Sequence, residues 1–175
     1  EDDPEWLRGE MHRLGMTGLK CYHVRGSFEP SFSAQIPDYM PERYFKLADE
    51  EGWTVTLHMV RDRACADEGN IHWIRYFCER YPNMKLILAH SARAFQPGYA
   101  LEGLPQLTGL DNLWCDTSAN CEAIAHQAII RILGHKRLLY GTDMPASHQR
   151  GRSAATGDSF VWMYEETPVW EQVHM

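Results

Sequence analysis

Three side chains in this sequence have the chemistry of a metal-dependent catalytic site, namely His58, His90 and Asp143. Imidazole nitrogen and carboxylate oxygen are donors that zinc and similar divalent ions take, and a catalytic ion keeps one position open for water. A carboxylate beside such an ion can remove a proton from water, and a histidine that is not a ligand can polarise a carbonyl or stabilise an oxyanion. These residue types therefore indicate hydrolytic chemistry, provided that the fold brings them together.

Each of the three residues lies at the end of a strand-like run or just after one. Five such runs can be read along the chain: Gly18–Val24, Trp53–His58, Met84–His90, Asn112–Asp116 and Arg137–Gly141. The polar residues at or near their ends are His23, His58, His90, Asp116 and Asp143. The carboxyl ends of parallel strands share one face of an α/β fold, so these side chains are expected to converge there.

Helix-forming segments separate the runs. They are 41–52, opened by Pro41 and stopped by Gly52; Ile71–Tyr81, capped by Asn70; a weaker segment over Tyr99–Leu107; and Ala123–Leu133, stopped by Gly134. The regular alternation predicts βαβ units and a parallel sheet. After Asp143 the pattern stops, and residues 144–160 are expected to form a loop.

The ordered runs resemble the amidohydrolase-related metal-dependent hydrolases. This group of TIM barrels also includes decarboxylases similar to aminocarboxymuconate-semialdehyde decarboxylase. The resemblance covers about Gly18–Phe160. It is carried by TLHMV (Thr56–Val60), LILAHSAR (Leu86–Arg93), LWCDTSA (Leu113–Ala119) and RLLYGTDMP (Arg137–Pro145), which look like strands five to eight, and by GLKCYHV (Gly18–Val24), which looks like strand four. It implies an α/β fold of the (β/α)8 TIM-barrel type in which this chain supplies about strands four to eight.

Carried over by position, the resemblance makes His58 the metal ligand of strand five and Asp143 a ligand and general base on strand eight. His90 falls on the strand-six histidine, a catalytic group that acts on the substrate or on water. The implied cofactor is a divalent metal ion, zinc in the first instance. The candidate substrate-binding residues are Lys20, His23, Arg61, Arg93 and Asp116.

One feature departs from the family pattern. The first strand of the family supplies a His-x-His pair of ligands, whereas no two of the nine histidines here are separated by two positions. A complete barrel needs about 250 residues. We therefore expect residues 1–175 to form a single amidohydrolase-type domain that is incomplete at the N-terminus, with the C-terminus also open to question. A degenerate, non-catalytic α/β binding module is the other interpretation.

Each candidate also has a structural interpretation. His58 and His90 could be hydrogen-bonded core histidines, Asp143 could cap a turn and Asp116 could cap the following helix. Lys20 and His23 could be packing or solvent-facing residues, and Arg61 and Arg93 could be ordinary surface charges.

The composition of the chain limits the classes of partner that we expect it to bind. The formal net charge is −7 and the basic residues are scattered, which argues against nucleic acid. No apolar run approaches the roughly 20 residues of a membrane helix, and the first ten residues have no secretory-signal character. Five cysteines without a CxxC motif favour free thiols in a reducing, cytoplasmic setting. The expected partner is a small-molecule substrate, with a homo-oligomer left open. The expected reaction is hydrolysis of a C–O or C–N bond, and nonoxidative decarboxylation is the alternative on the same frame.

Overall fold

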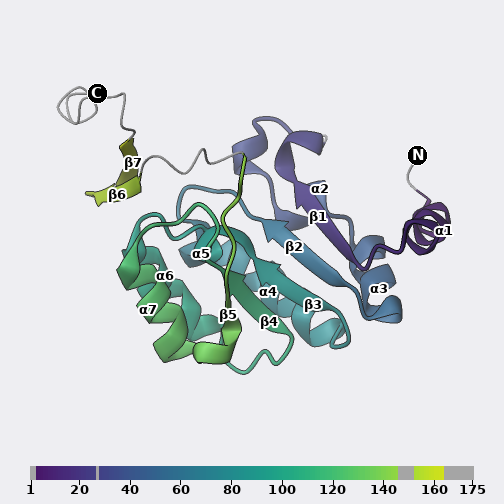
Figure 1. Ribbon diagram of the computed structural model, residues 1–175. Coiled ribbons are helices and arrows are strands. Elements are labelled where there is room, and N and C mark those ends of the chain that lie inside the picture. The colour runs from purple at the N-terminus through teal and green to yellow at the C-terminus, as the bar shows by residue number, and fades with distance from the viewer. Residues whose placement is uncertain (1–2, 27, 146–151, 164–175) are drawn as a thin grey trace.

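A computed structural model describes residues 3–26, 28–145 and 152–163, with Arg152 described only in its backbone. Its main feature is a parallel sheet of five strands in the order β1-β2-β3-β4-β5 (Figure 1). The strands are β1 (Gly18–Tyr22), β2 (Thr54–His58), β3 (Lys85–Leu88), β4 (Leu113–Asp116) and β5 (Leu138–Leu139). The predicted βαβ alternation is confirmed, because consecutive strands are neighbours and all four pairings are parallel.

Helices connect the strands and lie mainly on one face of the sheet (Figure 1). The α-helices are α1 (Pro4–Leu14), α2 (Ile36–Tyr39), α3 (Glu42–Glu51), α4 (Glu68–Arg80), α6 (Pro97–Gly103) and α7 (Ala123–Ile132). The short segment α5 (Ala89–Arg93) is a left-handed turn and not a regular α-helix. Short 3-10 turns are η1 (His23–Arg25), η2 (Ser31–Ser33), η3 (Ala64–Ala66), η4 (Leu104–Leu107) and η5 (His135–Arg137).

The helix boundaries follow the predicted signals with two exceptions, namely α4 and the weaker segment Tyr99–Leu107, which the structure divides between α6 and the 3-10 turn η4. Helix α3 follows Pro41 and ends at Gly52, which takes the left-handed conformation at φ 65°. Helix α4 begins earlier than expected, because its cap is Asp67 and not Asn70. The Asp67 carboxylate accepts from the Asn70 backbone N–H, and the buried Asn70 amide donates to the carbonyls of Val60 and Ala64, both at 2.8 Å. Asn70 thus holds the loop after β2 in place.

The two faces of the sheet differ in burial. Along β2 the side chains of Val55 and Leu57 are buried, whereas the alternate residues, ending in His58, are only partly buried. Strand β4 repeats this pattern, with Cys115 buried and Asp116 partly exposed. Because side chains alternate between faces, one face carries the buried apolar core. The other face carries partly buried side chains, both polar ones such as His58 and Asp116 and the apolar Ile87 and Trp114.

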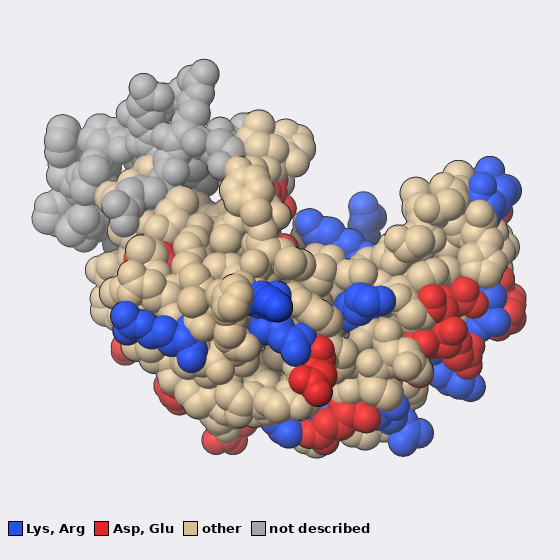
Figure 2. Space-filling model, turned by 60° about the horizontal axis from the view of Figure 1, so that its bottom comes forward, with Lys and Arg blue, Asp and Glu red and all other residues tan. Residues whose placement is uncertain are grey.

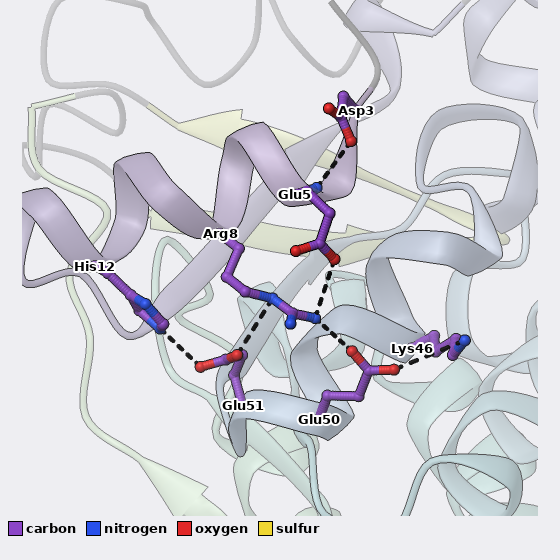
Figure 3. A network of polar contacts seen from close by, with 7 residues as sticks. All are labelled: Asp3, Glu5, Arg8, His12, Lys46, Glu50 and Glu51. Atoms are coloured by element: carbon purple, nitrogen blue, oxygen red, sulfur yellow. Dashed lines mark hydrogen bonds and ion pairs between the residues drawn. The ribbon is translucent and has the colours of Figure 1, made fainter.

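Helix α1 was not predicted from the sequence. Asp3 caps its first turn, and it ends at Gly15 with φ 64°. Figure 3 shows how a network of charged side chains attaches it to α3: Arg8 lies 2.5 Å from Glu50 and 3.3 Å from Glu51, and His12 lies 2.8 Å from Glu51. These pairs are partly solvent-exposed, so they orient α1 on α3 more than they stabilise the fold.

The expectation of a loop over residues 144–160 was wrong for its last part. Strands β6 (Arg152–Thr156) and β7 (Ser159–Met163) form an antiparallel hairpin around Gly157 and Asp158. Gly157 has φ 54°, a conformation that glycine adopts without steric cost. The hairpin packs beside the carboxyl end of the sheet, where Phe160 and Trp162 contact Phe95.

The distribution of surface charge and the state of the cysteines can be compared with what the sequence predicts. Figure 2 shows acidic and basic side chains interspersed on the face that it displays, without a continuous basic stripe. All five cysteines are free, and only Cys121 is exposed. Within the described ranges no helix is long and apolar enough to cross a membrane.

Candidate active site

The carboxyl end of the sheet gathers three histidine rings. His58 ends β2, and its ring centroid lies 4.9 Å from that of His90 and 5.6 Å from that of His23, in both cases edge to face. Tyr22 is the register partner of His58 on β1, and its ring lies 5.0 Å away. The structure therefore brings together His23, His58 and His90, although α2, α3 and α4 separate them in the sequence.

The environment of His58 favours the neutral imidazole. Its Nδ1 atom is buried and has no hydrogen-bond partner among the described residues. Burial lowers the pKa of His58 to about 3, helped by the neighbouring His90 and by the positive charge of Arg93. A neutral ring with a buried nitrogen that lacks a partner is costly as a structural residue, because such polar groups are normally satisfied. That nitrogen is suited to a ligand.

His90 lies beyond the end of β3, in a strained turn. Strand β3 is Lys85–Leu88, so the predicted run Met84–His90 begins one residue early and ends two residues late. The residues from His90 to Arg93 all have positive φ, between 54° and 60°. Left-handed backbone costs a non-glycine residue roughly 1–2 kcal/mol, and such strain concentrates at functional sites. The turn directs His90 toward His58 and Arg93 toward the loop after β2.

A set of buried polar contacts from the β4 end holds this turn. The Asp116 carboxylate accepts from the His90 backbone N–H at 2.9 Å, and the Asp116 carbonyl accepts from the Ser91 hydroxyl at 3.1 Å. The Asn120 amide donates to the carbonyls of His90 and Ala94, at 3.2 and 3.0 Å. Asp116 is therefore engaged with the protein itself, and its predicted contact with substrate stays a prediction.

Asp143 faces the opposite edge of the sheet. It follows β5 with φ 62°, and its side chain is 16% exposed. Its carboxylate lies 3.6 Å from the ammonium group of Lys20 on β1, which also sits over the ring of Tyr22. Burial acts to lower the pKa of Lys20, but Tyr22 and Asp143 together outweigh it and raise that pKa. The ion pair joins the first and last strands across the end of the sheet.

The two arginine candidates differ. Arg61 is ion-paired with Asp67 at 2.8 Å and donates to the Ser33 carbonyl at 3.1 Å, so its charge is already matched. Arg93 donates to the Arg61 carbonyl at 3.2 Å and packs over the ring of Phe32, but in the described part of the chain no carboxylate lies within ion-pairing distance of it. Burial lowers the pKa of Arg93, and the negative charge of Asp62 partly offsets this effect.

Arg93 lines a cavity of about 310 Å³ between the hairpin and the segments that follow β1, β2 and β3. Phe32, Tyr99 and Phe160 form its aromatic walls. Tyr99 also donates to the Asp158 carbonyl at 2.6 Å, and Gln96 donates to the Gly157 carbonyl at 3.0 Å, so the hairpin turn is fixed to this wall. The cavity adjoins the histidine cluster through two of its wall residues. Phe32 packs on His23, and Phe160 packs on Phe95, which stacks on His90.

Sequence reasoning missed the residues that support the site. Ser118, Asn120 and the hairpin aromatics were not singled out, although Ser118 and Asn120 stand in the DTSAN segment directly after the noted Asp116. The hairpin had a local signal too, because Gly-Asp between two strand-forming segments is typical of a two-residue turn.

The donor set fits a metal ion in type but is not complete. His58 offers a neutral imidazole and Asp143 a carboxylate, both of which zinc accepts. Within the described residues no group of three or more histidine, cysteine, aspartate or glutamate side chains could hold an ion.

A family model described as Amidohydrolase matches residues 2–166. The chain belongs to the amidohydrolase family. This match extends over nearly all of the sequence, including the hairpin and helix α1, and it confirms the family expected from the strand-end motifs. No curated protein sequence matches the chain.

Solved structures agree with the amidohydrolase fold. An amidohydrolase from Burkholderia multivorans superimposes with a TM-score of 0.57 at 15% identity, over 83% of this chain and 57% of that one. A 2,6-dihydroxybenzoate decarboxylase, solved with 2,6-dihydroxybenzoate bound, gives 0.55 at 17% identity, over 82% of this chain and 56% of that one. The chain thus spans somewhat more than half the length of these structures, and its five parallel strands form part of a TIM barrel.

Proposed function

We propose that the protein is a metal-dependent hydrolase that cleaves a C–O or C–N bond in a small metabolite. The observation that carries the proposal is His58, a neutral imidazole whose buried Nδ1 has no partner among the described residues, in contact with His90 at the carboxyl end of the sheet. In this proposal His58 and Asp143 hold a divalent ion, zinc in the first instance, together with ligands from outside the described residues.

Each residue has a part in the proposed reaction. A divalent ion at this position would act as a Lewis acid and make water more acidic. The carboxylate of Asp143 would accept a proton from water and return it to the leaving group. His90, fixed by the β4 end, would either orient that water or stabilise the negative charge that develops on the substrate. Lys20 would hold Asp143 in place through their ion pair until a substrate or an ion arrives.

The proposed substrate carries a negative charge. Arg93 lines the cavity beside the histidines without a carboxylate partner within ion-pairing distance among the described residues, and a partly buried guanidinium favours an anionic ligand. Asp62 and Asp158 also line the cavity, but both are exposed and therefore well solvated at its rim. A carboxylated metabolite of modest size fits these features. His23 packs on the cavity residue Phe32 and is a further candidate for contact with this substrate.

Decarboxylation is the second candidate. It is favoured by the fold shared with the 2,6-dihydroxybenzoate decarboxylase and by the aromatic walls around Arg93. Both reactions would use the same metal frame, and fold similarity does not separate them. The distinction has to come from the products.

Metal content tests the first part of the proposal. The whole protein, purified after growth with zinc, is expected to contain bound metal by elemental analysis. His58→Ala is expected to lose more than the roughly 10- to 100-fold in affinity that removing an outer-shell partner causes. His135→Ala is the matched control, because His135 is exposed on η5 at the other end of β5. Metal-free whole protein, or equal loss in both variants, would refute the metal site.

Product analysis tests the reaction. The metal-loaded whole protein is incubated with carboxylated lactones, carboxylated amides and aromatic carboxylates, and both acid release and CO2 release are measured. Hydrolysis that is lost in Asp143→Asn supports the leading proposal. Release of CO2 without hydrolysis favours the second candidate. If the metal-loaded protein forms neither product, the result supports a non-catalytic role.

A further inference from the structure

The ring of His90 has two oxygen neighbours at the same nitrogen. The Nδ1 atom lies 3.0 Å from the backbone carbonyl of Ser118 and 3.0 Å from the Ser118 hydroxyl oxygen. A carbonyl oxygen can only accept a hydrogen bond, whereas a hydroxyl group can donate or accept. The protonation of Nδ1 therefore depends on where the hydroxyl hydrogen of Ser118 points.

Asp116 settles the direction of that hydrogen. Its Oδ1 atom lies 2.5 Å from the Ser118 hydroxyl, and it also accepts from the backbone N–H groups of His90 and Ser118, at 2.9 and 3.0 Å. An oxygen that receives three donors acts as an acceptor throughout. The Ser118 hydroxyl must then donate its single hydrogen to Asp116, which leaves only a lone pair to face His90.

We infer that Asp116 and Ser118 are positioning residues that hold the neutral His90 ring in one tautomer, with its hydrogen on Nδ1 and a lone pair on Nε2. Both oxygens at Nδ1 are acceptors, so a hydrogen on Nδ1 makes a hydrogen bond, and a bare Nδ1 would face two lone pairs. The ring is buried, which strengthens this preference because water cannot take the place of either contact.

The consequence for the reaction rests on the proposed function. With its lone pair on Nε2, neutral His90 can accept a hydrogen bond from water or from a substrate hydroxyl and so orient it. It has no hydrogen on Nε2 to give to a negatively charged oxygen. Of the two roles proposed for His90, the inference therefore selects the orientation of an O–H group over the stabilisation of an oxyanion.

Side-chain 15N NMR of the histidines tests the inference directly. The spectrum of the purified whole protein, freed of metal, is recorded at about pH 8, where an ordinary histidine is neutral, and the His90 signals are identified by their loss in His90→Gln. The expected result is a protonated Nδ1 and a bare Nε2. A hydrogen found on Nε2 in the unmodified chain would overturn the inference, whatever the variants do.

Two variants test the roles of the positioning residues. Asp116→Asn frees the Ser118 hydroxyl to donate to Nδ1, and Ser118→Ala removes one of the two acceptors. Each is expected to raise the ratio of the Nε2–H to the Nδ1–H tautomer roughly fivefold, the effect of one ordinary hydrogen bond. Ser91→Ala is the matched control, because it removes a buried hydrogen bond to the Asp116 carbonyl and does not touch the ring. Unchanged ratios in both variants, or an equal change in the control, would show that other contacts set the tautomer.

This measurement is independent of turnover. It needs neither metal nor substrate, so the expected tautomer in a protein without hydrolase activity leaves the inference standing and removes the proposed function. Hydrolysis by a protein whose His90 carries its hydrogen on Nε2 would support the proposed function and overturn the inference.

Discussion

Replacement of Asn120 by alanine should release the strained turn that carries His90. The Asn120 amide donates to the carbonyls of His90 and Ala94, which begin and follow the left-handed residues, so one side chain bridges the whole turn. The Asn120 Oδ1 atom also accepts from the Glu122 backbone N–H at 2.8 Å. Three ordinary hydrogen bonds contribute about 1.5–4.5 kcal/mol together. The four left-handed residues cost about 4–8 kcal/mol by comparison with right-handed backbone.

The magnitude of the expected change follows from these two terms. Asn120→Ala loses the hydrogen bonds, but the turn can then relax and recover part of its strain. We expect the free energy of unfolding to fall by at most about 1.5–4.5 kcal/mol, while amide hydrogen exchange over residues 90–94 becomes faster than this loss would cause. The second effect is local, because it reports opening of the turn without unfolding of the sheet.

Asn112→Ala provides a matched control. Asn112 is also buried, and its amide donates to the carbonyls of Cys78 and Tyr81 at 3.2 and 2.9 Å, before the start of β4. Urea unfolding should show a loss of about 1–3 kcal/mol for this variant as well, whereas exchange at residues 90–94 should follow global stability only. If both variants change hydrogen exchange in the turn equally, or if neither does, Asn120 does not hold the turn in the way inferred from its hydrogen bonds.

Three further predictions concern stability and association. Gly103→Ala should destabilise the fold by about 1–3 kcal/mol or more in urea unfolding, because an added Cβ would lie 2.0 Å from the Cys65 carbonyl oxygen. The control Gly9→Ala in α1 places its Cβ where nothing lies within 4 Å, and it should stabilise the fold by about 0.5–1 kcal/mol. The reverse order of stabilities would contradict the packing of α6 on η3. The pKa of His58 is lowered to about 3 in the folded protein, so between pH 6.5 and pH 3 only the unfolded chain binds a proton at this residue. The free energy of unfolding should therefore fall by up to about 1.4 kcal/mol per pH unit as the pH decreases from 6.5 toward 3. His58→Gln should flatten this slope in denaturation curves, and an unchanged slope would mean that His58 is not the group responsible. Strands β1 and β5 each have one strand neighbour, and Tyr140 is 88% exposed beside β5, so residues 1–175 should associate in light-scattering measurements, and a monomer with a cooperative thermal transition would refute this.

The fold was largely predictable because its signals are local and repeated. Pro41 and Gly52 enclose α3, and the apolar periodicity of Ala123–Leu133 matches α7 within one residue. Helix α1 had comparable signals in Asp3, Pro4 and Gly15. Those signals were overlooked because the segment is mostly polar and lacks a wide apolar face.

The site was predictable only as a meeting of strand ends. The parallel sheet explains why His58 and His90 lie together, since both follow neighbouring strands. The left-handed turn after β3 could not be predicted, because none of the residues from His90 to Arg93 is glycine and local propensity disfavours this conformation. It exists through hydrogen bonds from the β4 end, which are tertiary contacts. The pairing of Lys20 with Asp143 likewise depends on how the sheet curves, which no local pattern contains.

The order of the strands has a consequence for how the chain folds. Each strand of the sheet pairs with the strand that precedes or follows it in the sequence, so the sheet can grow by adding one βα unit at a time, with short loop closures and a small entropic cost at each step. The ion pair between Lys20 and Asp143 is the exception, because it joins the first strand to the segment after the last. During synthesis on the ribosome the histidines can therefore reach their places before the carboxylate does. Any ion that needs both His58 and Asp143 would bind only to a chain whose last strand has formed, so binding would report completed folding.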